Sequence, residues 1–600
     1  MAARLANLVE LLDRSCDKFA SRPLFGTKRE DGWSWITYGE FRELVNRCRG
    51  GLSSLQVAPG DRVAIVSNNR VEWAVAAFAA YGLGAAIVPM YEAQHPSERE
   101  FILADCGAKV AFAATEAIAD EINAARPKLP ALEHVVGFGA PPGATSSFAA
   151  LLERGRVAHT PALVPAENVI AALVYTSGTT GKPKGVMLSH GNLVSNVNAL
   201  NDVFPFDPDD RSLSFLPWAH AFGLAELNVL LSMGCSLALS RDAKKVVEEL
   251  PEVKPTILVA VPRVFSRLYG AVQEQLHEHP RFVRALFGAA IRASAKRSSA
   301  DGNGPDILGS LSLRVMDRLV FSKVRERFGG RLKYAICGSA ALGLELAQFL
   351  DAVGIKVYEG YGLTETSPIV TTNSREHRRL GSVGKVVPGV RVVIDTSVVT
   401  EGDGEIIVYG PNVLKGYHNR PAEDAATLRP DGGLRTGDLG HFDDEGYLYV
   451  TGRIKEQFKL TNGKYVVPTV LEEALKLSRY IANALVYGDN KPYTVALVVL
   501  DTRRVRRWAE EQNFKLSDPT KDERVRKLIE REIRERSAGF KEYERTRAFA
   551  FVDDFSTENG LLTPTLKLKR AHAVKTFGPV LAALYGEDAE GSAARAHDRV

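Results

Sequence analysis

The alternation of short apolar runs with longer helical stretches is the feature that most narrows the folds open to this chain. The runs "RVAIVS" at 62–67, "AAIVPM" at 85–90 and "KVAFAA" at 109–114 are typical of buried strands, and helix-like stretches separate them. The alternation resumes near residue 169 and continues to "IKVYEGYG" at 355–362. Strands that alternate with helices form parallel sheets with helices on their faces. The sequence therefore predicts an α/β fold.

The length of the chain requires more than one domain. It has 600 residues, and a single hydrophobic core stops growing at about 250–300 residues. From about residue 391, "RVVIDTSV", "GEIIVYG" and "GYLYVTG" are separated by turns containing Gly and Asp, which predicts an antiparallel subdomain or barrel. Beyond residue 451, a helix at 467–478, strands at 483–488 and 493–500 and a charged helical stretch at 503–544 predict a smaller α+β region.

Charge and cysteine content limit the partners and the compartment. The 76 basic and 72 acidic residues leave a formal net charge of +4, which gives no reason to expect a nucleic-acid partner. The five cysteines form no CxxC pair, so reduced thiols in a cytoplasmic protein are expected. Glu10 and Asp13 interrupt the apolar residues of the N-terminus, which argues against a secretion signal.

Two segments raise the question of a membrane. Residues 73–91 carry no charge, but they are rich in Ala and contain Gly and Pro, so a buried helix to about residue 81, a turn and a strand are expected. Residues 281–297 interleave basic with apolar side chains. A surface helix packed on the domain is the favoured interpretation there, and peripheral contact with an anionic membrane is the alternative.

The segment "YTSGTTGKPKG" at 175–185 is typical of a loop that binds phosphate. It follows an apolar run and is rich in Gly, Ser, Thr and Lys. It is not the common P-loop, because only Thr179 and Thr180 separate Gly178 from Gly181 and a proline follows Lys182. The loop instead fits chemistry at the α-phosphate, in which the β- and γ-phosphates are gripped as a leaving group by hydroxyl and backbone N–H donors.

Four further motifs follow in order: "YEGYGLTET" at 358–366, "RTGDLG" at 435–440, "TGRIKEQFKLTNGKYVVP" at 451–468 and "LTPTLKLKR" at 562–570. Together with the loop, this set resembles the acyl-adenylate-forming superfamily, and its C-terminal half resembles the long-chain fatty acyl-CoA synthetases. The resemblance covers nearly the whole chain. It implies a large N-terminal domain, residues 1–452, of two layered α/β subdomains and a small β-barrel. A small α+β C-terminal domain, residues 453–600, would turn on a hinge at about 453–456.

The resemblance also implies two half-reactions. A fatty acid carboxylate attacks the α-phosphate of ATP to give acyl-AMP and pyrophosphate, and the thiol of CoA then displaces AMP. Mg²⁺ would accompany ATP. The sequence-based expectation is therefore an ATP-dependent fatty acyl-CoA ligase with ATP, a medium-to-long-chain fatty acid and CoA as its partners. No covalent acyl-enzyme is needed, because the acyl-AMP anhydride is itself the activated species.

The implied ATP-binding residues fall on these motifs. The phosphates are assigned to Thr176, Ser177, Gly178, Thr179, Thr180, Gly181 and Lys182. Adenine is assigned to Gly338, Ser339 and Ala340 in "CGSAAL" and to Glu359, Gly360, Tyr361 and Gly362. The ribose hydroxyls are assigned to Asp438 and Arg453, since a carboxylate accepts both protons of a diol.

The remaining implied roles are catalytic or concern the co-substrates. Thr364 would contact the α-phosphate, and Glu365, with Thr176, would hold Mg²⁺ as hard oxygen ligands. Lys567 would neutralise the charge that develops on the α-phosphoryl oxygens. Lys455 would be the hinge pivot, Gly463 would leave room for the pantetheine arm, and His220 in "PWAHAFG" would line the acyl pocket.

Two departures from the family pattern concern these roles. Some long-chain members place a gating Trp shortly after the acyl-pocket histidine, where this chain has Leu224, and Trp218 lies before the histidine instead. Many relatives have Gly before the catalytic lysine, where this chain has Leu566, so Lys569 and Arg570 compete with Lys567 for the role.

Three other functions stay open at this point. An acyl-AMP ligase that loads a carrier protein would accumulate acyl-AMP without forming acyl-CoA. A γ-phosphoryl kinase would release ADP, whereas the ligase releases AMP and pyrophosphate. A non-catalytic module that binds ATP or AMP would retain nucleotide affinity without turnover.

Overall fold

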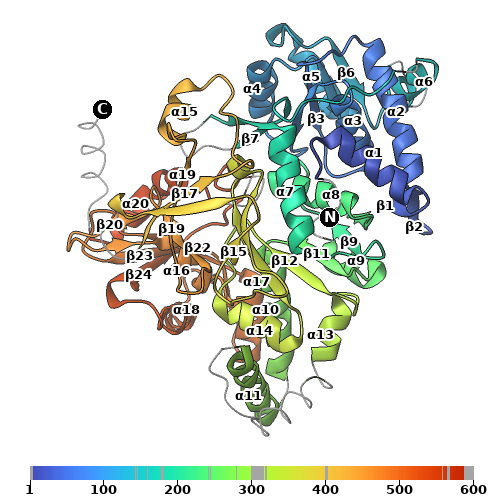
Figure 1. Cartoon of the computed structure of the whole chain (residues 1–600). Helices are drawn as coiled ribbons and strands as arrows, with labels where there is room; N and C mark the ends of the chain where they lie inside the picture. The colour runs from blue at the N-terminus through green and yellow to red at the C-terminus, as the bar shows by residue number, and fades with distance from the viewer. Residues whose placement is uncertain are drawn as a thin grey trace.

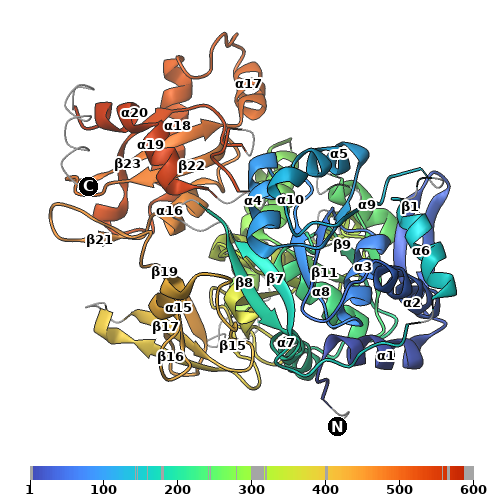
Figure 2. The same ribbon diagram turned by 90° about the horizontal axis from the view of Figure 1, so that it is seen from above.

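The structure is a computed structural model of the whole chain, and it shows an N-terminal α/β domain and a smaller C-terminal domain (Figures 1 and 2). It describes residues 4–586 apart from 142–143, 145, 159, 177–181, 241, 243–244, 279, 299–316, 318–320, 399–402, 557–558 and 564–567. The predicted α/β fold is confirmed.

The first sheet contains the predicted strands near residues 62–67, 85–90 and 109–114. It has six strands in the order β6 (His134–Gly137), β5 (Val110–Ala113), β3 (Arg62–Val66), β4 (Ala86–Met90), β7 (Ile170–Thr176) and β8 (Lys184–Ser189). Every pair is parallel except β7 with β8, which form a hairpin around the phosphate-loop segment. The sheet thus ends in the strand pair that carries the candidate loop.

The second sheet has nine strands. Their order is β15 (Lys385–Val386), β14 (Ile369–Thr372), β13 (Val357–Gly362), β12 (Tyr334–Cys337), β11 (Ile257–Ala260), β9 (Arg211–Ser214), β10 (Ser236–Leu239), β1 (Pro23–Arg29) and β2 (Gly32–Thr37). The middle of this sheet is parallel, and antiparallel pairs close both ends. The carboxyl ends of β12 and β13 lead into two candidate ATP motifs, so parallel pairing brings these motifs together.

Helices cover the two sheets of the N-terminal domain. They are α1 (Leu8–Phe19), α2 (Tyr38–Ser54), α3 (Val71–Tyr81), α4 (Pro96–Cys106), α5 (Glu116–Ala124), α6 (Phe148–Val157), α7 (His190–Val203), α8 (Ala221–Ser232), α9 (Val246–Val253), α10 (Pro262–Glu278), α11 (Arg281–Ser298), α13 (Ser322–Arg327) and α14 (Leu344–Val353). Helix α3 and strand β4 confirm the predicted helix, turn and strand in the uncharged stretch. Within the described ranges, no helix combines the length and apolarity that a membrane crossing requires.

The antiparallel region predicted after residue 391 forms a four-stranded sheet. The C-terminal domain follows it in sequence. The sheet has the order β16 (Arg391–Asp395), β17 (Gly404–Tyr409), β18 (Leu434–Phe442) and β19 (Leu448–Arg453), with α15 (Pro421–Thr427) between β17 and β18 in sequence. A hairpin of β20 (Phe458–Lys459) and β21 (Tyr465–Val466) follows. The C-terminal sheet contains β22 (Ile481–Tyr487), β23 (Thr494–Leu500) and β24 (Thr546–Phe551), and its helices are α16 (Pro468–Leu475), α17 (Thr502–Glu511), α18 (Glu523–Arg536), α19 (Arg570–Thr576) and α20 (Gly578–Ala583).

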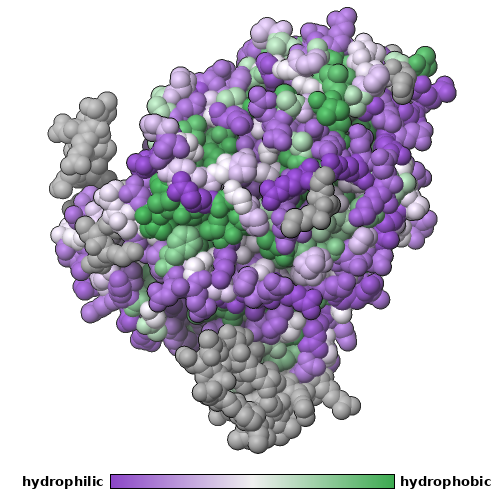
Figure 3. Space-filling view, in the orientation of Figure 1, coloured by the Kyte–Doolittle hydropathy of each residue, from purple (hydrophilic) through white to green (hydrophobic). Residues whose placement is uncertain are grey.

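The C-terminal domain has buried apolar clusters of its own, and its Leu477 also packs against the N-terminal core. Its buried side chains form two clusters that contain only residues from Phe458 onward, and Leu485, Val495 and Leu497 of the central strands are fully buried. Hydrophilic side chains predominate over most of the face in Figure 3, with hydrophobic ones gathered in limited areas. A domain with its own core can move as a unit.

Candidate active site

The stem of the phosphate loop is held by the hairpin β7–β8. Thr176 closes β7 and pairs with Lys184 at the start of β8. The loop residues Ser177, Gly178, Thr179, Thr180 and Gly181 lie outside the described residues. On the far side, the ammonium of Lys182 lies 5.5 Å from the ring centroid of Phe101 in α4, and Lys184 forms an ion pair of 2.6 Å with Glu423. The two ends of the loop are therefore anchored beside α4 and α15.

Asp105, at the end of α4, ties this stem to a second segment of chain. One carboxylate oxygen accepts a hydrogen bond of 2.6 Å from the Tyr175 hydroxyl, and the other accepts one of 2.9 Å from Arg420. Burial, together with this bond, raises the pKa of Tyr175 far above its usual range. Asp105 lies in no motif, so this contact was not predicted. It fixes the residue that immediately precedes Thr176.

Glu365 approaches the same edge through Tyr417. The Tyr417 hydroxyl donates to one Glu365 oxygen at 3.0 Å. The segment around Tyr417 continues the β7–β8 hairpin, because the N–H of Lys415 donates to the Met187 carbonyl at 2.9 Å and that of His418 to the Gly185 carbonyl at 2.8 Å. The predicted Mg²⁺ ligand thus lies beside the strand that leaves the phosphate loop. Tyr417, like Asp105, was not identified from the sequence.

The donors present fit a Mg²⁺ ion that arrives with ATP. Within the described part of the chain, no group of three or more His, Cys, Asp or Glu side chains is placed to hold a metal. Glu365 offers a second carboxylate oxygen besides the one bonded to Tyr417. Mg²⁺ in nucleotide sites is usually held by one or two carboxylates and completed by phosphate oxygens and water. A single Glu with a nearby Thr hydroxyl suits that arrangement.

Asp438, Arg453 and Tyr361 form the most tightly bonded part of the site. Asp438 and Arg453 face each other across β18 and β19, and their side chains form an ion pair of 2.8 Å. The Tyr361 hydroxyl donates to the other Asp438 oxygen at 2.7 Å. Burial raises the pKa of Tyr361 well above its usual range, and the Asp438 carboxylate adds to this. The carboxylate is held in one orientation and keeps lone pairs for further donors, as a diol-binding group requires.

These groups also lie close enough to Glu365 for its charge to act on them. The Asp438 carboxylate is the main cause of the raised pKa of Arg453, and Glu365 contributes to it as well. The Arg453 guanidinium therefore offsets charge on the Asp438 carboxylate before a nucleotide arrives. The motif-based assignments of Asp438, Arg453, Tyr361 and Glu365 therefore fall in one neighbourhood.

The predicted adenine turn joins β12 to α14. Cys337 pairs with Glu359 in the neighbouring strand, so Gly338, Ser339 and Ala340 leave the sheet beside the segment 359–362. Ser339 has φ +69°, a left-handed conformation that non-glycine residues adopt mainly at turns and functional sites. A Cβ atom on Gly338 would lie 3.2 Å from the Phe222 ring. The turn is therefore lined by an aromatic side chain from α8.

Glu359 supports this turn instead of facing outward. Its carboxyl group is buried and accepts a bond of 3.3 Å from the Leu342 N–H. Burial raises the pKa of Glu359 to about 7. Beyond it, a Cβ atom on Gly362 would lie 1.6 Å from the Pro368 carbonyl oxygen, so only glycine fits there. Thr364, also buried, then begins the short helical turn that carries Glu365.

His220 has a structural role that its motif did not reveal. It caps the start of α8, where its Nδ1 accepts a bond of 3.2 Å from the Phe222 N–H. Trp218 is buried and packs edge-on against Trp73 at 5.4 Å, and Leu224 is buried as well. Trp218 therefore belongs to the core. The His220 ring, half-buried, stands at the entry of the helix whose Phe222 reaches the adenine turn.

The predicted hinge and pantetheine residues lie on the C-terminal side. Lys455 is exposed in the turn after β19, where the N–H of Gln457 donates to the Arg453 carbonyl at 3.1 Å. Gly463 turns the β20–β21 hairpin with φ +84°, and no atom lies within 4 Å of the position that a Cβ would take. Its left-handed backbone is by itself a reason for glycine. Among the described residues, no hydrogen bond or ion pair joins Lys455 or Gly463 to the Asp438 cluster.

Lys567 lies outside the described residues, but the residues that follow it, from Leu568 on, are described. Leu562 pairs with Leu568. The Lys569 ammonium lies 3.8 Å from Glu98 in α4 of the N-terminal domain, whereas Arg570 forms an ion pair of 2.6 Å with Glu472 inside the C-terminal domain. The Arg570 side chain is thus held by an ion pair within the C-terminal domain. Lys569 approaches the helix that also contacts Lys182.

Comparisons with known proteins show the family to which this chain belongs. Residues 12–418 match the family described as AMP-binding enzyme, and residues 455–588 match the AMP-binding enzyme C-terminal domain. The long-chain-fatty-acid–CoA ligase FadD15 of Mycobacterium bovis is 34% identical over 571 residues, which are 93% of each chain. The peroxisomal long chain acyl-CoA synthetase 7 of Arabidopsis thaliana is 31% identical, over 95% of this chain and 85% of that protein.

A solved structure shares the fold. The adenylation domain of a carboxylate reductase from Mycobacterium chelonae superposes with a TM-score of 0.78 and 23% identity, over 98% of this chain and 92% of that one. The predicted resemblance, made from five short motifs, is confirmed over nearly the whole chain.

Proposed function

This chain belongs to the family of AMP-binding enzymes, and from that membership we propose that it is an ATP-dependent long-chain fatty acid–CoA ligase. It converts a fatty acid, ATP and CoA into acyl-CoA, AMP and pyrophosphate through an acyl-adenylate. The observation that carries the proposal is the 34% identity, over 93% of both chains, to a ligase named for long-chain fatty acids. The Asp438–Arg453–Tyr361 cluster beside Glu365 supports it, because these are the residues that the motifs assign to the nucleotide.

The first half-reaction joins the acid to AMP. A carboxylate oxygen attacks the α-phosphorus, and the bond from that phosphorus to the β-phosphate bridging oxygen breaks, releasing pyrophosphate. Asp438 accepts hydrogen bonds from the ribose hydroxyls, which fixes the position of the α-phosphate. Thr364 contacts the α-phosphate oxygens. Lys567 neutralises the charge that develops there. Glu365 and Thr176 would hold Mg²⁺ together with the phosphates, and the ion would supply positive charge to the leaving pyrophosphate.

The second half-reaction transfers the acyl group to CoA. The thiol sulfur attacks the acyl carbon, the bond from that carbon to the AMP oxygen breaks, and the thiol proton leaves to solvent. We assign residues 1–452 and 453–600 as the two domains, with 453–456 as the hinge and Lys455 as its pivot. Rotation at this hinge would replace the Lys567 segment at the acyl-adenylate by the hairpin that carries Gly463, beside which the pantetheine arm would pass.

The location and the acyl preference are part of the proposal. Five free and buried cysteines support a reducing compartment, and we place the enzyme in the cytoplasm. Peripheral membrane contact near residues 281–297 is the alternative. There Phe282 is 70% exposed, while Phe287 and Ala290 are buried against the domain. We infer a preference for medium-to-long fatty acids, with His220 in the acyl pocket.

The test is a product assay across carboxylic acids of increasing chain length. With ATP, Mg²⁺ and CoA present, we expect pyrophosphate, AMP and acyl-CoA in equal amounts, with the highest kcat/KM for medium-to-long chains. Persistent acyl-AMP without thioester would favour a ligase that loads a carrier protein. Release of ADP, binding of ATP without turnover, or the best activity with acetate or aromatic acids would each contradict the proposal.

A further inference from the structure

Glu365, the implied Mg²⁺ ligand, is held at both ends by one short segment of the chain, residues 414–418. Its backbone carbonyl accepts a hydrogen bond of 2.9 Å from the Leu414 N–H. Its carboxylate oxygen Oε1 accepts one of 3.0 Å from the Tyr417 hydroxyl. An ionised carboxylate only accepts, so the tyrosine proton lies in this bond. Among the described residues, no hydrogen bond or ion pair engages the other carboxylate oxygen, Oε2, which stays available to a ligand.

The same segment extends the six-stranded sheet beyond β8. The N–H of Met187 in β8 donates to the Gly416 carbonyl at 3.0 Å, and Val186 forms an antiparallel β-bridge with Tyr417. Strand β8 pairs in turn with β7, which ends at Thr176, the other implied Mg²⁺ ligand. Backbone hydrogen bonds therefore connect Thr176 to the segment that carries Tyr417, and the tyrosine hydroxyl completes the connection to Glu365.

Helix α15 holds the same segment in place. The Tyr417 N–H donates to Asp424, in the first turn of α15, at 2.7 Å. The neighbouring Glu423 forms its ion pair of 2.6 Å with Lys184 of β8. Tyr417 is itself only 7% exposed, so close packing fixes its ring. The direction in which the Tyr417 hydroxyl points is thus set by the fold and not by solvent.

We propose that Tyr417 is a positioning residue for Glu365. Its hydroxyl occupies one carboxylate oxygen and leaves the other, in a fixed orientation, for the Mg²⁺ ion that accompanies ATP. Hydrogen-bond partners of this kind orient metal ligands, and their loss typically lowers metal affinity by about 10–100-fold. The proposal rests on the function proposed above, since it concerns the metal of that reaction's nucleotide. It gives Tyr417 no part in the conversion of acyl-AMP to acyl-CoA, a step without a triphosphate.

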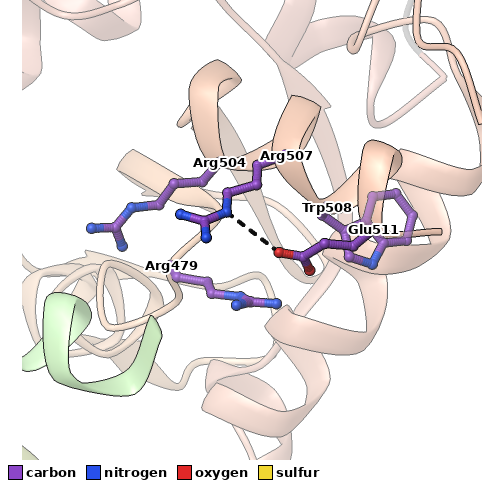
Figure 4. Close-up of a pocket in the computed structure, with 5 residues that line it drawn as sticks. All are labelled: Arg479, Arg504, Arg507, Trp508 and Glu511. Atoms are coloured by element: carbon purple, nitrogen blue, oxygen red, sulfur yellow. Dashed lines mark ion pairs between the residues drawn. The ribbon is translucent and has the colours of Figure 1, made fainter. Parts of the chain in front are cut away.

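A change in Mg²⁺ dependence would report on this site, because the described residues offer the ion little else. Among them, no group of three or more His, Cys, Asp or Glu side chains is placed to hold a metal. Figure 4 shows a hollow on the C-terminal domain whose lining residues are Arg479, Arg504, Arg507, Trp508 and Glu511. The carboxylate of Glu511 pairs there with Arg507 at 3.5 Å. Three guanidinium groups around this carboxylate repel a divalent cation.

The experiment measures binding of α,β-methylene-ATP, whose α–β bridge cannot be cleaved, by calorimetry at increasing Mg²⁺ without acid or CoA. In Tyr417→Phe, which removes only the hydroxyl, the Mg²⁺ concentration for half-maximal binding should rise by about tenfold or more. Binding of the same analogue in EDTA should stay within twofold of the wild type. Tyr409→Phe is the matched control, because the Tyr409 hydroxyl also donates to a carboxylate, that of Asp431, at 2.9 Å.

A half-maximal Mg²⁺ concentration within twofold of the wild type in Tyr417→Phe would overturn the assignment, and so would an equal rise in Tyr409→Phe. Equal losses of analogue binding with Mg²⁺ and in EDTA would also overturn it, since a hydroxyl that only supports the fold would weaken both.

Conversion of supplied acyl-AMP and CoA to acyl-CoA should stay within twofold of the wild type in Tyr417→Phe. A larger loss would make Tyr417 a residue of the fold and not of the metal site. The binding measurement uses neither acid nor CoA, so it is separate from the test of the proposed function. A wild type that binds the analogue with Mg²⁺ but forms no acyl-CoA would overturn the proposed function alone.

Discussion

Single side chains set the geometry of the phosphate loop, and Asp105 is the clearest case. Its carboxylate joins Tyr175, which precedes Thr176, to Arg420 near α15. Asp105→Asn removes the charge and replaces one of the two acceptor oxygens by an NH₂ donor, so Tyr175 and Arg420 can no longer both donate to this side chain. A lost bond to a charged group costs about 1.5–3 kcal/mol, so KM for ATP should rise by at least tenfold.

Conversion of supplied acyl-AMP and CoA to acyl-CoA should change little in Asp105→Asn, since that step does not use the triphosphate. Asp209→Asn is the control, because Asp209 is a largely exposed aspartate that also pairs with an arginine. An equal loss in both half-reactions would show that Asp105 supports the fold and not the loop.

The candidates for the catalytic lysine can be separated by substitution. Lys567→Ala should slow acyl-AMP formation by about 10²–10³-fold, as expected for one preorganised transition-state donor. It should largely spare thioester formation from supplied acyl-AMP. The Lys569 ammonium lies 3.8 Å from Glu98, so Lys569→Ala should weaken a contact between the domains. It should slow acyl-AMP formation only a few fold. If Lys569→Ala abolishes adenylation while Lys567→Ala retains it, the register of this motif is wrong.

Secondary-structure elements were the part of the molecule best predicted from sequence. Apolar runs bounded by Gly and Pro marked β3, β4, β5 and most parallel strands, because a buried strand needs a continuous apolar run. The hairpin β1–β2 and the edge strands β14 and β15 were not predicted. Their pairing depends on which sheet edge they meet in the folded chain, and no local periodicity records that.

The residues of the candidate site also divide into those that a motif predicted and those that it did not. Asp438, Arg453 and Glu365 were found because each falls within a motif, and the structure brings them together. Tyr417 and Asp105 were not found, since their contacts join segments more than 50 residues apart. The second role of Tyr361, which orients Asp438, depends on a side-chain direction that a motif does not specify.

Helix α8 carries a buried acid that makes stability depend on pH. Glu226 accepts bonds from Ser212 at 2.7 Å and Ser214 at 2.9 Å, yet burial raises its pKa from 4.5 to about 7. The folded state therefore holds this proton more tightly than the unfolded state. Its contribution to stability is complete below pH 4.5 and is lost as pH rises through 7. The total loss is about 3 kcal/mol, from about 1.4 kcal/mol for each pKa unit.

Glu226→Gln keeps the shape but removes the titration. The Tm of the wild type should fall relative to that of Glu226→Gln as pH rises from 5 to 8, when both proteins are scanned at one rate. A Tm difference that is constant across this range would show that Glu226 does not titrate in the folded protein.

The whole molecule is held in its present arrangement partly by polar contacts between its two domains. Glu345, in the first turn of α14, accepts a bond of 2.6 Å from the Tyr269 hydroxyl and forms an ion pair of 2.8 Å with Arg536 of the C-terminal domain. Helix α14 begins directly after the adenine turn, so this pair joins the C-terminal domain to an element of the nucleotide site.

Glu345→Gln keeps the acceptor for Tyr269 and removes the charge that faces Arg536. Acyl-AMP formation should slow by about two- to fivefold, the range for a partly exposed ion pair. Thioester formation from supplied acyl-AMP should not slow, because the proposed rotation of the domain would break this contact in any case. Glu153→Gln, which removes an ion pair within the N-terminal domain, serves as the control. Equal slowing of both steps would remove Glu345 from any role in domain position.

The polar character of this seam makes the balance between the half-reactions sensitive to ionic strength. Among the described residues beyond the hinge, the ion pairs Glu345–Arg536 and Glu98–Lys569 cross it, and their side chains are at least a quarter exposed. Dissolved salt screens such pairs, because the Debye length falls from about 10 Å at 0.1 M ionic strength to about 3 Å at 1 M. An apolar seam would instead tighten in a salting-out medium. Added KCl should thus act on this enzyme as a loosening agent that slows adenylation while it leaves the conversion of supplied acyl-AMP largely intact.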